Sequence, residues 1–116
     1  MQFIKIAADK TFFLLLQSNK KETMISVNEY FDGTVKSLGY TSAQGKSTIG
    51  VIEKGEYEFG TSQHETMIVI EGVMDALLPE KSEWVSFLAG QSFEVEANKS
   101  FKVKVSEQVS YLCKYK

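Results

Sequence analysis

The stretch that most constrains the fold is residues 55–72, which read GEYEFGTSQHETMIVIEG. In its first part Tyr57 and Phe59 alternate with glutamates, and this period of two predicts a half-buried strand. Residues 65–70 are mostly apolar and end at a Glu-Gly pair, which predicts a second strand that is buried on both faces. The polar segment between these runs, residues 60–64, contains a glycine and predicts a turn or short loop.

Glu65 is the unusual residue of this stretch. If the strand pleat is regular, Glu65 shares a face with Met67 and Val69. A carboxylate on the apolar face of a strand is costly unless it has a partner or a chemical role. The pattern therefore marks Glu65 as a candidate functional residue. The alternative is a structural carboxylate that hydrogen bonds satisfy at the start of a strand.

Short strand-like runs separated by turn residues continue along most of the chain. A polar loop with Gly45-Lys46 at its tip is expected over residues 41–47, and an Asp-Gly turn signal lies within residues 28–33. About ten short strands without sustained helical periodicity predict an all-β sandwich or barrel. Besides the two strands above, the expected strands are residues 34–40, 48–52, 73–78, 84–88, 91–95, 101–105 and 111–115.

The chain is expected to contain one domain, residues 24–116, preceded by an extension over residues 1–23. A length of 116 residues suits a single hydrophobic core. The apolar run at residues 12–16 (FFLLL) is too short to span a membrane, and no small-residue cleavage site makes it a signal peptide. We expect the extension to be an extra strand or an arm that packs on the body or on a second subunit.

Charge and the rare residue types exclude several classes of function. The net charge of −2 argues against a nucleic-acid binder with a broad basic face. All the basic residues are lysines, so an anion site cannot use the bidentate guanidinium group. The single cysteine, Cys113, permits no internal disulfide and suits a reducing, cytoplasmic location. The single histidine, His64, excludes a histidine-rich metal centre within one subunit, although a carboxylate-only cation site stays open.

Part of the central stretch is similar to a cupin motif. Glu65, followed by six residues and Gly72, matches the end of the first cupin motif, and the second motif would begin at Gly90. The positions of the metal-binding histidines hold other residues, namely EFGT at 58–61 and Phe101. No metal and no cofactor are therefore expected.

Six ordered blocks resemble the pyrimidine/purine nucleoside phosphorylase family, whose members are small single-domain cupins. The resemblance covers residues 28–116 and leaves out residues 1–23. It implies a cupin-type antiparallel β-barrel (a double-stranded β-helix, or jelly roll). Where the family carries arginine, this chain has Lys46 and Lys114. The blocks are NEYFDGTVKS (28–37), GEYEF (55–59), ETMIVIEG (65–72), LLP (77–79), AGQSFEV (89–95) and SYLCKY (110–115).

The implied activity is that of a metal-independent pentosyltransferase of broad specificity. Such an enzyme splits purine and pyrimidine nucleosides with phosphate, the co-substrate, into free base and ribose 1-phosphate. Cleavage of the N-glycosidic bond passes through an oxocarbenium-like sugar, for which Glu65 is the candidate catalytic carboxylate. Lys36, Ser37 and Lys46 are the candidate phosphate-binding residues. The candidate substrate-binding residues are Tyr57, Phe59, Thr61, Met67, Phe93, Phe101 and Tyr111.

Two alternatives to this enzyme stay open. The same barrel could hold a nucleoside or a sugar without turning it over, or it could be a cupin that acts on a sugar or keto acid by another reaction. The candidate aromatic residues could equally fill the interior of a small barrel. The expected partners are small-molecule nucleosides and phosphate, with neither a nucleic acid nor a membrane. A homodimer through sheet edges is also expected, because a small barrel leaves edge strands that need cover.

Overall fold

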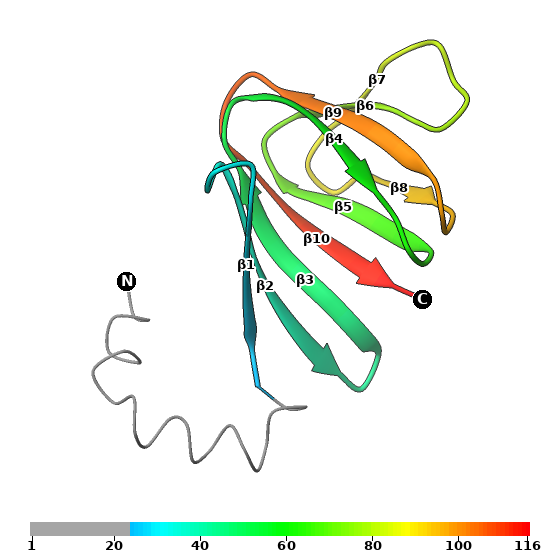
Figure 1. Cartoon of the computed structure of the whole chain (residues 1–116). Helices are drawn as coiled ribbons and strands as arrows, with labels where there is room; N and C mark the ends of the chain where they lie inside the picture. The colour runs from blue at the N-terminus through cyan, green and yellow to red at the C-terminus, as the bar shows by residue number, and fades with distance from the viewer. Residues whose placement is uncertain (1–23) are drawn as a thin grey trace.

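The computed structural model describes residues 24–116, which form ten β-strands (Figure 1). Within this part of the chain, no helix is long and apolar enough to cross a membrane. The ten strands confirm the expected all-β class. The strands are β1 (Ser26–Tyr30), β2 (Val35–Ser42), β3 (Gly45–Ile52), β4 (Gly55–Gly60), β5 (Glu65–Glu71), β6 (Met74–Leu77), β7 (Val85–Phe87), β8 (Ser92–Val95), β9 (Ser100–Val105) and β10 (Val109–Tyr115).

Antiparallel ladders divide the strands into two sheets. One sheet has six strands in the order β1-β2-β3-β10-β5-β8, and the other has four in the order β4-β9-β6-β7. The connection between β3 and β4 passes from the larger sheet to the smaller one, and the connection between β4 and β5 returns (Figure 1). Consecutive strands of the central stretch therefore lie on opposite sides of the core, which places residues 55–72 on both walls of the interior.

The core lies between the two sheets and follows the period of two that the sequence predicts. On β4 and β9, Tyr57 pairs with Val103, and both side chains are buried. The exposed Glu58 lies opposite Lys102, so the outer face of this ladder pairs opposite charges. On β5, Met67 and Val69 are both buried, which confirms the predicted inward face.

Two local predictions are wrong. Residues 41–47 are not a loop, because β2 continues to Ser42 and β3 begins at Gly45, with a two-residue turn between them. Apart from the buried Ser47, the polar side chains there are exposed in the strands or in the turn, and this exposure explains their polarity. The strand at residues 65–70 is buried on one face only, since 47% of the Ile70 side chain is exposed. An antiparallel sheet can present an apolar residue to solvent, and an apolar run alone does not reveal this.

Candidate functional site

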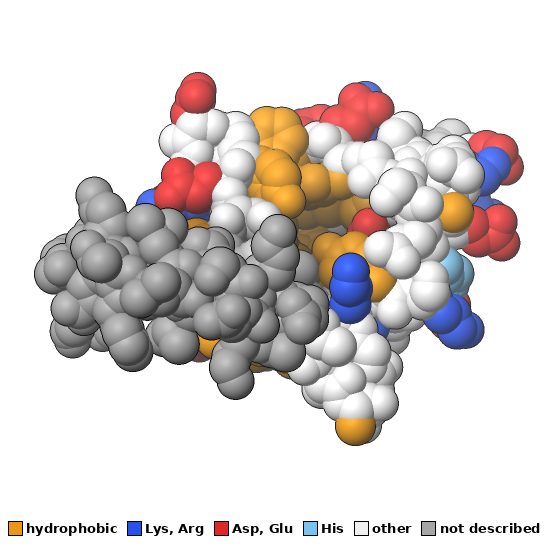
Figure 2. All heavy atoms as spheres, turned by 60° about the horizontal axis from the view of Figure 1, so that its bottom comes forward, with side chains coloured by type: hydrophobic (Ala, Val, Ile, Leu, Met, Phe, Trp, Pro, Cys, Tyr) orange, Lys and Arg blue, Asp and Glu red, His pale blue; other side chains and the backbone are white. Residues whose placement is uncertain are grey.

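A cavity of about 540 Å³ opens between the two sheets. Its volume is within the range of small-molecule sites in proteins. Figure 2 shows a hollow whose walls are mainly apolar. The lining residues are Tyr30, Phe31, Ser37, Thr48, Ile52, Glu58, Phe59, Gly60, Ser62, Glu65, Met67, Phe101, Tyr111, Cys113 and Tyr115.

Glu65 is the first residue of β5, and its half-buried carboxyl group lies at the cavity wall. The thiol of Cys113, on the neighbouring strand β10, donates a hydrogen bond to Glu65 Oε1 at 3.4 Å. Burial raises the pKa of Glu65 above its usual 4.5, while this hydrogen bond and the nearby His64 act in the opposite direction. The site thus holds a carboxylate whose charged form is incompletely solvated.

The groups around Glu65 on β10 keep their protons at neutral pH. Burial, followed by the charge of Glu65, raises the pKa of the Cys113 thiol to about 12. Burial also raises the pKa of the Tyr115 hydroxyl, which lies 3.3 Å from Thr48 Oγ1. Cys113 therefore has almost no thiolate and is unsuited to act as a nucleophile. It serves instead as a neutral donor to Glu65.

Tyr111 forms another part of the wall, and a glycine on the adjacent strand makes room for its ring. Tyr111 lies opposite Gly50 in the β3–β10 ladder. A Cβ atom at Gly50 would lie only 2.5 Å from the Tyr111 ring, so any larger residue would displace it. Burial raises the pKa of Tyr111 to about 12, against the effect of a hydrogen bond with Ser37.

The structure brings together about half of the residues that the sequence proposes for the site. Glu65 lines the cavity together with Ser37 and four proposed substrate-binding residues. Lys36 and Lys46 are exposed and do not line it. The roles assigned to all these residues stay predictions. The four substrate-binding residues in the wall are Phe59, Met67, Phe101 and Tyr111.

Two of the proposed aromatic residues belong to the core next to the cavity. The Tyr57 hydroxyl donates to the backbone carbonyl of Glu53 at 2.6 Å, and the ring is 8% exposed. Phe93 is also buried, with its ring centroid 4.7 Å from that of Phe87 and 5.8 Å from that of Phe101. These two rings support the cavity wall from behind.

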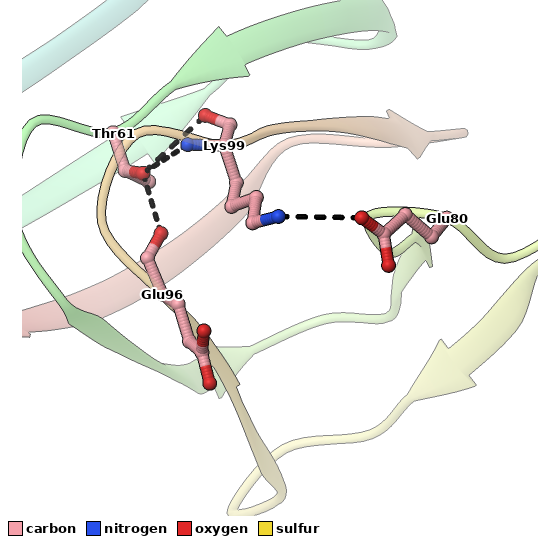
Figure 3. A network of polar contacts seen from close by, with 4 residues as sticks. All are labelled: Thr61, Glu80, Glu96 and Lys99. Carbon is pink, nitrogen blue, oxygen red and sulfur yellow. Dashed lines mark hydrogen bonds and ion pairs between the residues drawn. The ribbon is translucent and has the colours of Figure 1, made fainter.

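Thr61 is committed to loop structure. Its hydroxyl donates to the carbonyl of Glu96 at 2.7 Å, and it accepts from the backbone N–H of Lys99 at 3.1 Å (Figure 3). The Lys99 ammonium group in turn lies 3.2 Å from a carboxylate oxygen of Glu80. This network joins the loop after β4 to the β8–β9 turn, close to the end of β4 that lines the cavity.

Several lining residues were not among the sequence candidates. The alternation of Tyr111, Cys113 and Tyr115 on β10 could have revealed the last two, because these three residues share one face. Tyr30, the last residue of β1, and Phe31, in the β1–β2 turn, also line the cavity, and the sequence marks this segment only as a turn. No sequence signal shows that a turn between two strands of the larger sheet reaches the cavity between the sheets.

Comparison with known proteins identifies the family. A sequence profile described as "Pyrimidine/purine nucleoside phosphorylase" matches residues 25–115. The chain belongs to the pyrimidine/purine nucleoside phosphorylase family. A relative from Pseudoalteromonas atlantica that carries this name is 56% identical over 92 residues, which are 79% of this chain and 99% of the relative.

Solved structures confirm the cupin class. A protein of unknown function from Vibrio parahaemolyticus has a TM-score of 0.78 and 39% sequence identity to this chain. The match covers 80% of this chain and 99% of that one. An RmlC-like cupin from Shewanella frigidimarina has a TM-score of 0.61 at 18% identity, covering 81% of this chain and 83% of that one, and shows the fold alone. The matched profile region begins one residue before β1 and leaves residues 1–23 aside.

Many cupins bind a metal inside the barrel, so the donor groups of the described residues decide whether such a site can form here. Within residues 24–116, no three or more His, Cys, Asp and Glu side chains are grouped so that they could hold a metal ion. In the cavity, the Cys113 thiol is protonated and bonded to Glu65, which leaves one inward carboxylate without further ligands. The donors present do not fit a cupin metal centre.

Proposed function

We propose that this protein is a nucleoside phosphorylase of broad specificity that needs no metal ion. The observation that carries the proposal is the position of Glu65, a half-buried carboxylate in the wall of an aromatic cavity. The membership of this chain in a family named for this activity supports the same proposal. The substrates would be purine and pyrimidine nucleosides with phosphate, and the products free base and ribose 1-phosphate.

The aromatic wall suits the recognition of many bases. Phe59, Phe101 and Tyr111 offer ring surfaces, and stacking on such surfaces depends little on the identity of a base. Ring stacking requires no particular hydrogen-bond pattern, so it does not reject a base that lacks a particular donor or acceptor. The cavity is therefore better suited to hold purines and pyrimidines alike than to select one of them.

Glu65 would act on the sugar. In phosphorolysis, a phosphate oxygen forms a bond to C1′ while the C1′–N bond breaks. The base leaves with the electron pair of that bond and takes up the proton that the phosphate loses, and the sugar carries positive charge in between. The ionised carboxylate of Glu65 stabilises this charge more than the neutral ground state, which is the condition for a higher rate. Low solvation at the cavity wall strengthens the effect.

Hydroxyl groups are the donors available for phosphate in the wall. Ser37 was proposed from the sequence, and Thr48, Ser62 and Tyr115 also line the cavity. Neutral O–H donors bind phosphate without the long-range attraction of a guanidinium or ammonium group. We therefore expect the protein to need a high phosphate concentration for half-maximal rate.

One feature of the cavity wall supports an alternative function, namely binding without turnover. Among the described residues that line the cavity, none is a lysine. A protein that binds nucleosides without turnover would need no cation for phosphate. The cavity would then be a ligand-binding site that lacks the second reactant.

One assay separates the two functions. The full chain is incubated with inosine or uridine, with and without phosphate, and the free base is measured by chromatography. The phosphorylase releases base and ribose 1-phosphate only when phosphate is present. Tight nucleoside binding without release of base at any phosphate concentration would overturn the enzyme and support the binding protein. Release of base without phosphate would indicate a hydrolase instead.

A further inference from the structure

The β1–β2 turn contains an aromatic residue in an unfavourable conformation at the cavity mouth. Phe31 has a φ of 53°, in the left-handed region that residues with a bulky side chain rarely adopt. Its side chain is 47% exposed even though it lines the cavity. Backbone strain and an exposed ring are both unfavourable, and they coincide in one residue. Strained residues of this kind are concentrated at ligand sites.

The turn is held in place from both sides. Within the turn, the backbone carbonyl of Phe31 accepts hydrogen bonds from Thr34 Oγ1 at 2.8 Å and from the Thr34 N–H at 3.2 Å. Across the molecule, the Phe31 ring lies 5.2 Å from the Tyr57 ring and 5.6 Å from the Phe59 ring, centroid to centroid. Both of these residues are on β4, a strand of the smaller sheet. The ring of Phe31 is therefore fixed relative to the cavity before any ligand arrives.

The relative angles of the rings suggest what the exposed part can bind. Phe31 meets Phe59 at 90° and Tyr57 at 62°, so these are edge contacts rather than parallel stacking. Edge contacts leave ring surface uncovered, in agreement with the exposure of Phe31. A flat heteroaromatic ring is the ligand that gains most from such a surface, because parallel stacking requires no particular hydrogen bonds.

We propose that Phe31 is the residue on which the base of a bound nucleoside stacks. This inference rests on the proposed function and adds a base-binding surface to the cavity that Glu65 also lines. Stacking on a fixed ring provides affinity for every base, and more for a purine, whose two fused rings offer more surface. Phe31 would thus bind both classes of nucleoside and favour purines moderately.

Substitutions at Phe31 test the stacking contact in the full chain. Phe31→Leu keeps an apolar side chain without an aromatic face, and Phe31→Tyr keeps the face. Binding of inosine, uridine and ribose 1-phosphate is measured by calorimetry, each ligand without its co-substrate. Phe31→Leu should weaken inosine binding by about tenfold or more, and uridine binding less, because one stacked base accounts for about this loss. Phe31→Tyr should stay within about threefold of the parent, by the same stacking.

Ribose 1-phosphate separates stacking from a structural role, since it has no base. Its affinity should be the same in the parent and in Phe31→Leu. The control variant is Leu88→Ala, which removes another exposed apolar side chain, 53% exposed, that does not line the cavity. Leu88→Ala should bind all three ligands as the parent does. Steady-state kinetics of Phe31→Leu with phosphate should show a raised KM for inosine and little change in kcat.

Three results would overturn the inference. The first is that Phe31→Leu binds inosine as tightly as the parent does. The second is that its affinity for ribose 1-phosphate falls as much as its affinity for inosine. The third is that the substitution changes the subunit association of the protein. The last outcome would mean that another copy of the chain covers the ring. If Phe31→Leu does not fold, Phe31→Asn replaces it, since asparagine tolerates the left-handed conformation of this turn. Inosine binding without phosphorolysis in the parent would reject the proposed enzyme, while the affinities would still test the stacking.

Discussion

Glu65 combines two properties that a purely structural carboxylate does not need. Its pKa is raised by burial, so ionisation is unfavourable in the fold, and it faces a cavity rather than a cation. A single thiol hydrogen bond, from Cys113 at 3.4 Å, is a weak compensation for the lost hydration. A carboxylate kept under such conditions is a candidate for electrostatic work on a ligand.

We predict that Glu65→Gln lowers phosphorolysis by two to three powers of ten while the fold is kept. Glutamine preserves the shape and some of the hydrogen bonding but removes the charge that stabilises the oxocarbenium-like sugar. The loss is about that caused by removing one preorganised electrostatic contact. Steady-state kinetics with inosine and uridine, together with a melting curve, measure both quantities. A variant that melts like the parent and works within about threefold of its rate would make Glu65 only structural.

The dependence of stability on pH gives Glu65 a second, independent test. Its folded-state pKa is raised above 4.5, so between 4.5 and that pKa the folded state binds more protons than the unfolded state. The free energy of unfolding therefore falls as pH rises through this window. Glu65→Gln removes the effect, so its melting temperature should gain on that of the parent as pH rises from 4 toward neutrality. If the difference in melting temperature between Glu65→Gln and the parent stays constant across this range, Glu65 is not desolvated in the folded state.

For single residues, the sequence predicted which residue is unusual but not which groups surround it in the fold. Glu65 was recognisable because a charged residue interrupts an apolar face, which is a property of the local pattern. Its hydrogen bond with Cys113 joins residues 48 positions apart and depends on the β5–β10 register. No single-residue rule contains that register. Lys36 and Lys46 show the converse case, since their chemistry suited phosphate but their strand positions point away from the cavity.

At the scale of strands and turns, alternation predicted most of the molecule correctly. β4 and β9 were recognisable because each alternates apolar with charged residues, and each has one face in the core. The β2–β3 hairpin was misread because its residues are polar on both faces near the tip, where the hairpin extends past the smaller sheet. Alternation reports the contrast between two environments, and it vanishes where both faces meet solvent.

The pairing of β3 with β10 depends on one glycine, which gives a prediction for this element. Gly50→Ala should lower stability by about 1–3 kcal/mol, as overpacking does, because the new Cβ would meet the Tyr111 ring at 2.5 Å. Displacing this ring should also weaken nucleoside binding, since Tyr111 lines the cavity. Denaturant unfolding and nucleoside titration measure the two effects.

Gly45→Ala is the matched control, with open space around the position of its added Cβ atom. Gly45 has a φ of 110°, so this substitution strains a turn without touching the cavity. It should cost stability and leave nucleoside affinity unchanged. Equal binding losses in both variants would show that general destabilisation, rather than the position of Tyr111, reduces affinity.

For the molecule as a whole, the lack of a metal-binding group in residues 24–116 leads to a prediction about chelators. Phosphorolysis should be unchanged after dialysis against EDTA, because the proposed chemistry uses a carboxylate, hydroxyl donors and stacking. The assay is the release of base with and without EDTA, followed by addition of divalent ions. Loss of activity that a divalent ion restores would contradict the metal-free mechanism.

The six-stranded sheet has an apolar outer face that the fold leaves uncovered within the described residues. One row of apolar side chains crosses five of its strands. Lys36 on β2 and Glu71 on β5 lie in the next row, which begins at Glu29 on β1. A twofold axis parallel to the strands, between β3 and β10, would place β2 of one copy over β5 of another. Lys36 would then face Glu71 of the second copy. The apolar row consists of Val27, Leu38, Ile49, Leu112 and Ile68.

We therefore predict a homodimer and place its contact on this outer face rather than at the sheet edges suggested by the sequence. Sedimentation velocity at micromolar concentration should show a dimer for the parent. Ile49→Lys should give a monomer, because it buries an unpaired charge in the middle of the apolar row. Lys36→Glu should weaken the dimer through repulsion from Glu71, and adding Glu71→Lys should restore it.

Val85→Lys is the control for a charge on an exposed apolar residue, since Val85 is 47% exposed on β7 of the other sheet. It should sediment as the parent does. A monomeric parent would reject the dimer. A dimer that survives Ile49→Lys but not Val85→Lys would move the contact to the smaller sheet. The dimer contact predicted on the outer face leaves the cavity between the sheets open, so the monomeric Ile49→Lys variant should still bind nucleoside with the affinity of the parent.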